Sequence, residues 1–127
     1  MICSFDPERG LIVVQAEVFG PSGSIILRLA LDTGATGTMI NVAPLTAVGY
    51  DPSLVPGRVQ VTTGSGVEFA PRIVVAQMRA MGQERSGFPV LAHTLPPSAS
   101  VDGLLGLDFL RGQTVTIDLR RGSVSFA

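Results

Sequence analysis

The feature that most constrains this chain is the way its apolar residues are grouped. They occur in short runs rich in Val, Ile, Leu and Thr, each ended by Gly, Pro, Ser or Asp, and the sequence holds 15 Gly and 9 Pro. Such runs are typical of β-strands, because β-branched side chains suit a pleated strand while Gly and Pro suit the turns between strands. The sequence therefore predicts a mainly β fold.

The length of the chain limits how many domains it can form. With 127 residues it has the usual size of one domain, so we expect residues 1–127 to fold as a single unit. Hydrophobic residues make up 46% of the sequence and charged residues only 15%. This is apolar for the surface of a monomer, which favours burial of some surface against a partner chain.

The predicted strands follow the apolar runs, and they cover residues 11–18, 24–31, 38–40, 58–63, 67–78, 88–93, 114–119 and 123–127. The first two form a hairpin around a glycine-rich turn, and the second of them leads directly to Asp32. The fourth and fifth form another hairpin with a glycine-rich tip. Pro71 in its second strand indicates a bulge or an edge.

Two short helical segments are also expected. Residues 41–51 have Asn41 as a cap candidate, Pro44 in the first turn and Gly49 as a stop, which together predict one short helix. Residues 103–112 have the spacing of a buried loop that enters a second short helix.

The composition excludes several classes of function. All nine cations are Arg, which excludes a Schiff-base lysine and the lysine of a phosphate-binding P-loop. The net charge of −1, without a basic stripe, argues against nucleic acid as a partner. One cysteine, Cys3, and one histidine, His93, are too few for a disulfide framework or an ordinary zinc site, so neither a metal nor a cofactor is expected.

No segment of the sequence has the character of a membrane span or a leader. No apolar run approaches the roughly 18 to 20 residues needed to cross a bilayer, and the first residues lack the pattern of a signal peptide. The expected location is cytoplasmic by default, although the chain could be a fragment of a longer protein.

The segment LALDTGATGTMI places an acidic residue, Asp32, directly after an apolar strand and before a Thr-Gly turn. A lone carboxylate buried at such a strand end would be costly. On local grounds alone, Asp-Thr-Gly is also an ordinary turn. Far downstream, however, VDGLLGLDFL has two apolar residues followed by Gly106, a pattern that accompanies the Asp-Thr-Gly loop in aspartic peptidases.

Taken in order, the segments LALDTGATGTMI, TTGSG and GLLGLDFL resemble the single-domain retropepsin-like aspartic peptidases, particularly bacterial members. The resemblance covers nearly the whole chain. It implies a closed retropepsin-like (acid protease) β-barrel with one or two short helices. It also implies a homodimer in which Asp32 of each chain meets its mate across a two-fold axis.

The chemistry of peptide hydrolysis explains why such a site needs two chains. Without a metal or a covalent nucleophile, the reaction needs a base to activate water and an acid to protonate the amide, and two adjacent carboxylates that share one proton supply both. One Asp cannot play both parts at once. We therefore expect an aspartic endopeptidase that is most active on the acidic side and binds an extended, mostly apolar peptide.

The resemblance also assigns supporting roles to the neighbours of Asp32. Thr33 would hydrogen-bond across the dimer, Gly34 would let a backbone amide approach the carboxylate, and Ala35 would keep the cleft floor small. Beneath this loop the expected packing residues are Leu104, Leu105 and Gly106. The flap that closes over substrate would have its tip at Thr63, Gly64, Ser65 and Gly66, where glycines suit a moving hairpin.

The sequence departs from the retroviral pattern at two positions. Thr36 stands where those members have an acid, and Leu107 stands where they have an arginine, so the corresponding ion pair is missing and dimer contacts must come from elsewhere. The nearby Asp102 and Asp108 are interpreted as a turn residue and a helix-start residue. His93 is expected to have no catalytic role.

Two other functions compete with proteolysis. A retropepsin fold could serve as a peptide-binding or assembly module without cleavage, because a fold does not fix a function. Alternatively, DTGATGT could hold a phosphorylated aspartate as in haloacid dehalogenases. That chemistry requires an α/β scaffold with Mg²⁺ ligands and usually a lysine, and the sequence has neither the expected scaffold nor a lysine.

Overall fold

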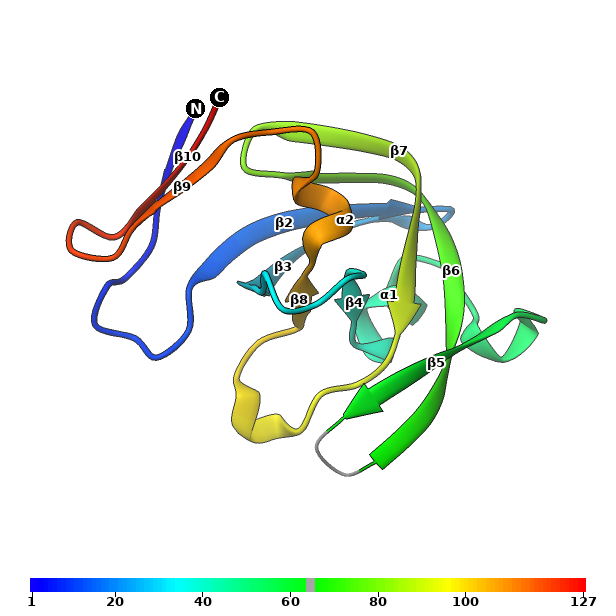
Figure 1. Cartoon of the computed structure of the whole chain (residues 1–127). Helices are drawn as coiled ribbons and strands as arrows, with labels where there is room; N and C mark the ends of the chain where they lie inside the picture. Colours follow the sequence, from blue (N-terminus) through cyan, green and yellow to red (C-terminus); the bar gives the residue numbers. More distant parts are fainter. Residues whose placement is uncertain (64–65) are drawn as a thin grey trace.

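The computed structural model describes residues 1–63 and 66–127. In chain order its elements are β1 (Ile2–Ser4), β2 (Val13–Gly20), β3 (Gly23–Leu31), β4 (Met39–Ile40), α1 (Val42–Ala47), η1 (Pro52–Leu54), β5 (Arg58–Thr63), β6 (Gly66–Ala80), β7 (Gln83–Ala92), η2 (Pro97–Ala99), β8 (Gly103–Leu105), α2 (Leu107–Leu110), β9 (Val115–Asp118) and β10 (Ser123–Phe126). Strands greatly outweigh helices, so the predicted mainly β class is confirmed (Figure 1).

Six of the strands close into a barrel. β3 pairs with β2 on one side and with β8 on the other, and β4 joins β8 to β7. β6 pairs with β7 and, through its second half, with β2, which completes the ring. β5 pairs with the first half of β6, and the two extend from the barrel as a hairpin arm, residues 58–63 and 66–71 (Figure 1). The predicted closed barrel is therefore confirmed.

The two predicted hairpins both form. β2 pairs antiparallel with β3, and β5 pairs antiparallel with β6. Pro71 lies where β6 changes partner, because the last pair with β5 is Arg58↔Pro71 and the first pair with β7 is Arg72↔Leu91. A residue without an N–H is tolerated at the end of a ladder.

A third hairpin escaped the sequence analysis. β6 continues to Ala80 and β7 already begins at Gln83, so these strands are longer than the predicted ones at residues 67–78 and 88–93. The turn between them is Met81-Gly82, with φ angles of 52° and 73°. Such left-handed pairs suit a tight hairpin turn, but methionine is an unusual residue for the first position, so the dipeptide carried no turn signal.

The helices are short, as predicted, but two details differ. Asn41 is at the cap position of α1 without capping it through its side chain; its Oδ1 accepts instead from the N–H of Leu95 at 3.0 Å. Residues 103–105 form strand β8 rather than the expected loop. The sequence did not predict this strand, because three residues are too few to show a periodic pattern. No helix in residues 1–63 and 66–127 is long and apolar enough to cross a membrane.

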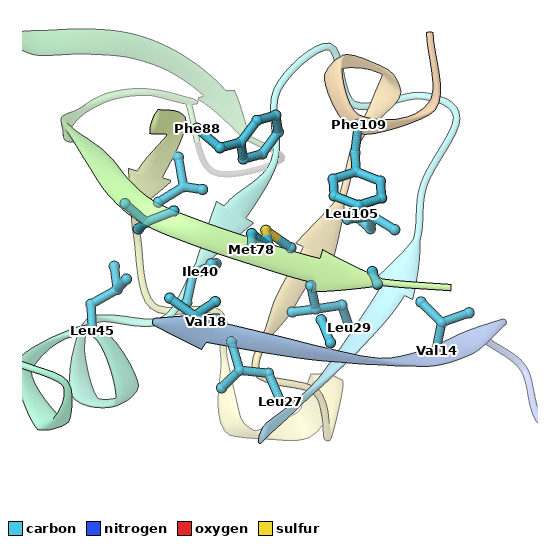
Figure 2. Packing of buried hydrophobic residues seen from close by; sticks show 14 of the residues in the cluster. Val14, Val18, Leu27, Leu29, Ile40, Leu45, Met78, Phe88, Leu105 and Phe109 are labelled. Carbon is cyan, nitrogen blue, oxygen red and sulfur yellow. The ribbon is translucent and has the colours of Figure 1, made fainter. Parts of the chain in front are cut away.

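The barrel interior is filled by aliphatic side chains from nearly every strand, including Val18, Leu29 and Ile40, which are fully buried. Figure 2 shows these side chains converging between the strands, with Phe109 entering the same cluster from α2. The Phe109 ring meets Phe88 edge to face, with centroids 5.7 Å apart. This packing fixes α2 against the barrel.

The two chain ends form a separate three-stranded sheet in the order β1-β10-β9, and the termini lie side by side in Figure 1. The N–H of Phe126 donates to the carbonyl of Met1 at 3.1 Å, and the N–H of Phe5 donates to that of Gly122 at 2.8 Å. The thiol of Cys3 is free and half-buried against the core.

β8 runs between β3 and β4 with a close approach of the backbones. Gly103 pairs with Ile40, and a Cβ on Gly103 would come within 2.1 Å of the carbonyl oxygen of Met39. Only a residue without a side chain allows this approach.

Replacing Gly103 by alanine is therefore expected to push β8 away from β4 and to lower the free energy of unfolding by about 2 kcal/mol or more. Urea unfolding at one fixed protein concentration measures the change. Gly10→Ala is the matched control, because nothing lies within 4 Å of a Cβ at Gly10. Equal stability of the two variants would contradict the assignment of Gly103 to a steric role.

Candidate active site

Asp32 lies immediately beyond the end of β3, where the chain leaves the barrel. Its N–H donates to the carbonyl of Leu105 in β8 at 2.9 Å, and the N–H of Leu31 donates to the carbonyl of Ile12 at 2.8 Å. These two hydrogen bonds hold the backbone of this strand end in place. The half-buried side chain of Asp32 therefore starts from a fixed position while remaining open to solvent.

The carboxylate of Asp32 is oriented by its own loop. Its Oδ1 accepts from the N–H of Gly34 at 2.8 Å, and its carbonyl accepts from the N–H of Ala35 at 3.2 Å. A Cβ on residue 34 would lie 3.1 Å from that Oδ1, so glycine gives the amide its close approach. Thr33 is exposed at the outer side of this turn.

The segment that follows β8 supports the Asp32 loop from below. The N–H of Leu107 donates to the carbonyl of Ala35 at 2.8 Å. A Cβ on Gly106 would lie 2.8 Å from the carbonyl carbon and oxygen of Gly37, so these two backbones are in direct contact. Leu105 is fully buried and Leu104 half-buried beside them. The structure thus brings together the Asp-Thr-Gly and Leu-Leu-Gly segments that the sequence analysis paired.

A pair of residues that the sequence analysis did not assign to the site fixes the far end of the loop. Thr38 is fully buried. Its hydroxyl donates to Oδ1 of Asp108 at 2.7 Å and accepts from the N–H of Gly106 at 3.1 Å, while its N–H donates to Oδ2 of Asp108 at 3.0 Å. Asp108 lies in the first turn of α2, as predicted, and its carboxylate also clamps the Asp32 loop to this helix.

The sequence carried no local signal of this clamp. Thr38 is one of three threonines that follow Asp32 in the loop, and Asp108 lies 70 residues further along the chain. Their distance along the chain concealed the contact, which only the fold creates.

The expected flap is only partly described. Thr63 ends β5 and Gly66 begins β6 with a φ of 126°, while Gly64 and Ser65 lie outside the described residues. A hollow between the base of the hairpin arm and the Asp32 loop has Val59, Gln60 and Gly37 in its wall. The arm is therefore adjacent to the loop that carries Asp32.

Asp102 and His93, the two other residues weighed in the sequence analysis, both have structural contacts. Asp102 bridges two strands, since its Oδ2 accepts from the N–H of Arg28 at 2.9 Å and its carbonyl accepts from the N–H of Asn41 at 2.8 Å. His93 lies 3.4 Å from the carboxylate of Glu68. Residues 1–63 and 66–127 contain no group of three His, Cys, Asp or Glu side chains that could hold a metal ion.

The haloacid-dehalogenase alternative does not fit this arrangement. Its chemistry needs an α/β scaffold, whereas Asp32 here follows a strand of a closed barrel whose hairpins are antiparallel.

The Thr38–Asp108 clamp predicts a specific loss of stability. Thr38→Val keeps the side-chain volume but leaves the buried N–H of Gly106 without its acceptor and removes the hydroxyl that donates to Asp108, so we expect unfolding to become easier by about 1 to 3 kcal/mol. Combining it with Asp108→Asn in a double-mutant cycle should give less than the sum of the single effects.

Thr36→Val serves as the control for this cycle, because Thr36 is exposed two residues earlier in the same loop. Its effect should stay within about 0.5 kcal/mol. Additive effects of the Thr38 and Asp108 substitutions would show that the two residues act independently, contrary to the clamp.

Comparison with known proteins agrees with this geometry. A family model described as aspartyl protease matches residues 14–109. Among solved structures the chain is similar to the crystal structure of a retropepsin-like aspartic protease from Rickettsia conorii, with a TM-score of 0.73 and 18% sequence identity over 98% of this chain and 97% of that one. No curated protein matches significantly. The chain therefore belongs to the aspartyl protease family and has the retropepsin-like fold.

Proposed function

We propose that the protein is an aspartic endopeptidase that works as a homodimer, with Asp32 of each chain forming one shared catalytic pair. The observation that carries the proposal is the state of the Asp32 carboxylate. Its Oδ1 accepts from Gly34, but in residues 1–63 and 66–127 its Oδ2 has no hydrogen-bond partner. A carboxylate that is held by its backbone and open on one side is suited to meet a second carboxylate and a water molecule.

Electrostatics explains why one Asp32 of the pair acts as the base and the other as the acid. Two carboxylates in contact cannot both ionise cheaply, so they share one proton. The ionised member takes a proton from the water as that water attacks the peptide carbonyl. The protonated member then serves as the acid for the departing amine. Because this state requires one proton on the pair, activity is expected to be highest on the acidic side.

In the proposed dimer, each of the residues around Asp32 has a role. Thr33 is exposed beside Asp32 and makes no hydrogen bond through its side chain within the described part of the chain, which leaves its hydroxyl available to the partner loop. Gly34 holds the carboxylate, and Ala35 takes little space in the cleft floor. Leu104, Leu105 and Gly106 keep the loop in place from below.

The terminal sheet offers a surface for the second copy. The hydrogen bonds of Met1 and Phe5 point toward β10, and alternation along a strand turns the backbone groups of Ile2 and Ser4 the other way. β1 is thus an edge of its three-stranded sheet, and Ile2 is 70% exposed. Pairing of this edge with a second chain would cover both the backbone groups and the apolar side chain.

The proposed substrate is an extended polypeptide bound between the Asp32 loop and the hairpin arm, where backbone hydrogen bonds would hold it in strand form. The flap tip at Thr63, Gly64, Ser65 and Gly66 would close over it.

Asp32→Asn should abolish cleavage of unfolded protein at acidic pH, with a loss of at least about 100-fold, because the pair loses its acid-base couple. Glu8→Gln is the matched control, since Glu8 is exposed and makes no ion pair within residues 1–63 and 66–127. Mass spectrometry of the digest detects the products. If wild type and Asp32→Asn both leave the protein intact while binding peptides equally, the chain is a peptide-binding module instead.

Mixing experiments test whether the site is shared between chains. When wild type is equilibrated with a roughly ninefold excess of Asp32→Asn chain, about one tenth of the wild-type chains keep a wild-type partner, so activity should fall about tenfold. The same excess of Glu8→Gln chain should raise activity. Undiminished activity in the first mixture would show that each chain carries a complete site.

A further inference from the structure

The hollow beside the Asp32 loop has a charge distribution that bears on substrate choice. It measures about 280 Å³ and is bounded by the loop, the base of the hairpin arm, β7 and α2. Thr36 and Gly37, only a few residues after Asp32, form part of its wall. A peptide bound along the loop would therefore place a side chain in this hollow.

Two charged side chains line the hollow, Arg72 and Asp108. The carboxylate of Asp108 is engaged, since it accepts two hydrogen bonds from Thr38 and one from the N–H of Phe109 at 2.9 Å. Arg72 is exposed, and within residues 1–63 and 66–127 its guanidinium has neither an ion pair nor a hydrogen bond. The hollow therefore holds one charge of each sign, but only the carboxylate has hydrogen-bond partners, and the N–H donors of the Arg72 guanidinium are unused.

Within the described part of the chain, no acid forms an ion pair with Arg72. Glu68 lies on the same face of β6, roughly 13 Å away along the strand, and its carboxylate is 3.4 Å from His93. Another hollow, of about 500 Å³ and lined by β2 residues, is different, because its arginine, Arg79, already contacts Glu17 and Glu84.

We propose that Arg72 binds a carboxylate side chain of the peptide substrate, so that the enzyme favours Glu or Asp a few residues from the cleaved bond. This inference rests on the proposed proteolytic function. A guanidinium forms two parallel hydrogen bonds with a carboxylate, which gives the site geometric as well as electrostatic selectivity. The mostly apolar preference expected from the composition would then apply to the other positions of the substrate.

The test uses peptides of one parent sequence in which Glu or Gln stands at each of the positions within about four residues of the cleaved bond. At one of these positions wild type should cleave the Glu peptide with a kcat/KM roughly fivefold higher than the Gln peptide. The ratio should shrink in high salt, and it should also shrink as the pH falls through about 4.3, where the glutamate of the peptide becomes neutral.

Variants identify the residue responsible. Arg72→Gln should bring the ratio close to one, and Arg72→Glu should favour a Lys peptide over the Glu peptide. Arg58→Gln is the matched control, because Arg58 is an exposed arginine at the base of the neighbouring hairpin arm and does not line the hollow. It should leave the ratio unchanged.

The outcomes separate this inference from the proposed function. Cleavage of every peptide with equal kcat/KM, a preference for Lys in wild type, or a Glu preference that survives Arg72→Gln would each overturn the role of Arg72 while leaving proteolysis intact. Absence of any cleavage would overturn the proteolytic function. In that case fluorescence anisotropy with the same labelled peptides still decides the role of Arg72, since equal affinity for the Glu and Gln peptides would rule it out.

Discussion

The structure depends on the passage of one short strand, β8, between β3 and β4. Two glycines make it possible, because a Cβ on Gly103 would meet the carbonyl of Met39 and a Cβ on Gly106 would meet Gly37. With β8 in this place, the carbonyl of Leu105 receives the N–H of Asp32. Closure of the barrel and the position of the acidic residue are thus consequences of the same close packing.

The Asp32 loop is held at both ends but stays open in the middle. Leu105 fixes its start, while Thr38 and Asp108 fix its end through three hydrogen bonds in a buried setting. Such bonds are worth more where water is excluded, and leaving one partner unpaired there is costly. Between these anchors Thr33 and one oxygen of Asp32 face outward. A site that a second molecule completes needs a loop with rigid ends and an accessible middle.

The charges around the hairpin arm are arranged unevenly. Glu68 is matched with His93, and Asp108 is matched with Thr38, but Arg72 is left without a partner in the described part of the chain. In a chain with so few charged residues, an unpaired cation next to the Asp32 loop is a strong local feature. A hollow of mixed polar and apolar walls that contains one unpaired guanidinium can discriminate by charge.

The sequence by itself determined the β class, the strand that ends at Asp32, two hairpins and the pairing of the Asp-Thr-Gly and Leu-Leu-Gly segments. These depend on local propensity, turn residues and a recognisable order of motifs. The Met81-Gly82 turn was missed because methionine carries no turn signal, and β8 was taken for a loop because three residues show no period.

Only the tertiary structure decided which polar and charged side chains of distant segments come together. The contact of Thr38 with Asp108 and the position of Arg72 beside the Asp32 loop join segments that lie far apart in the chain. Neither contact follows from local propensity, since it exists only after the barrel has closed. The sequence fixes which short segments can form strands and turns, whereas long-range packing decides which polar groups are satisfied and which charge remains free.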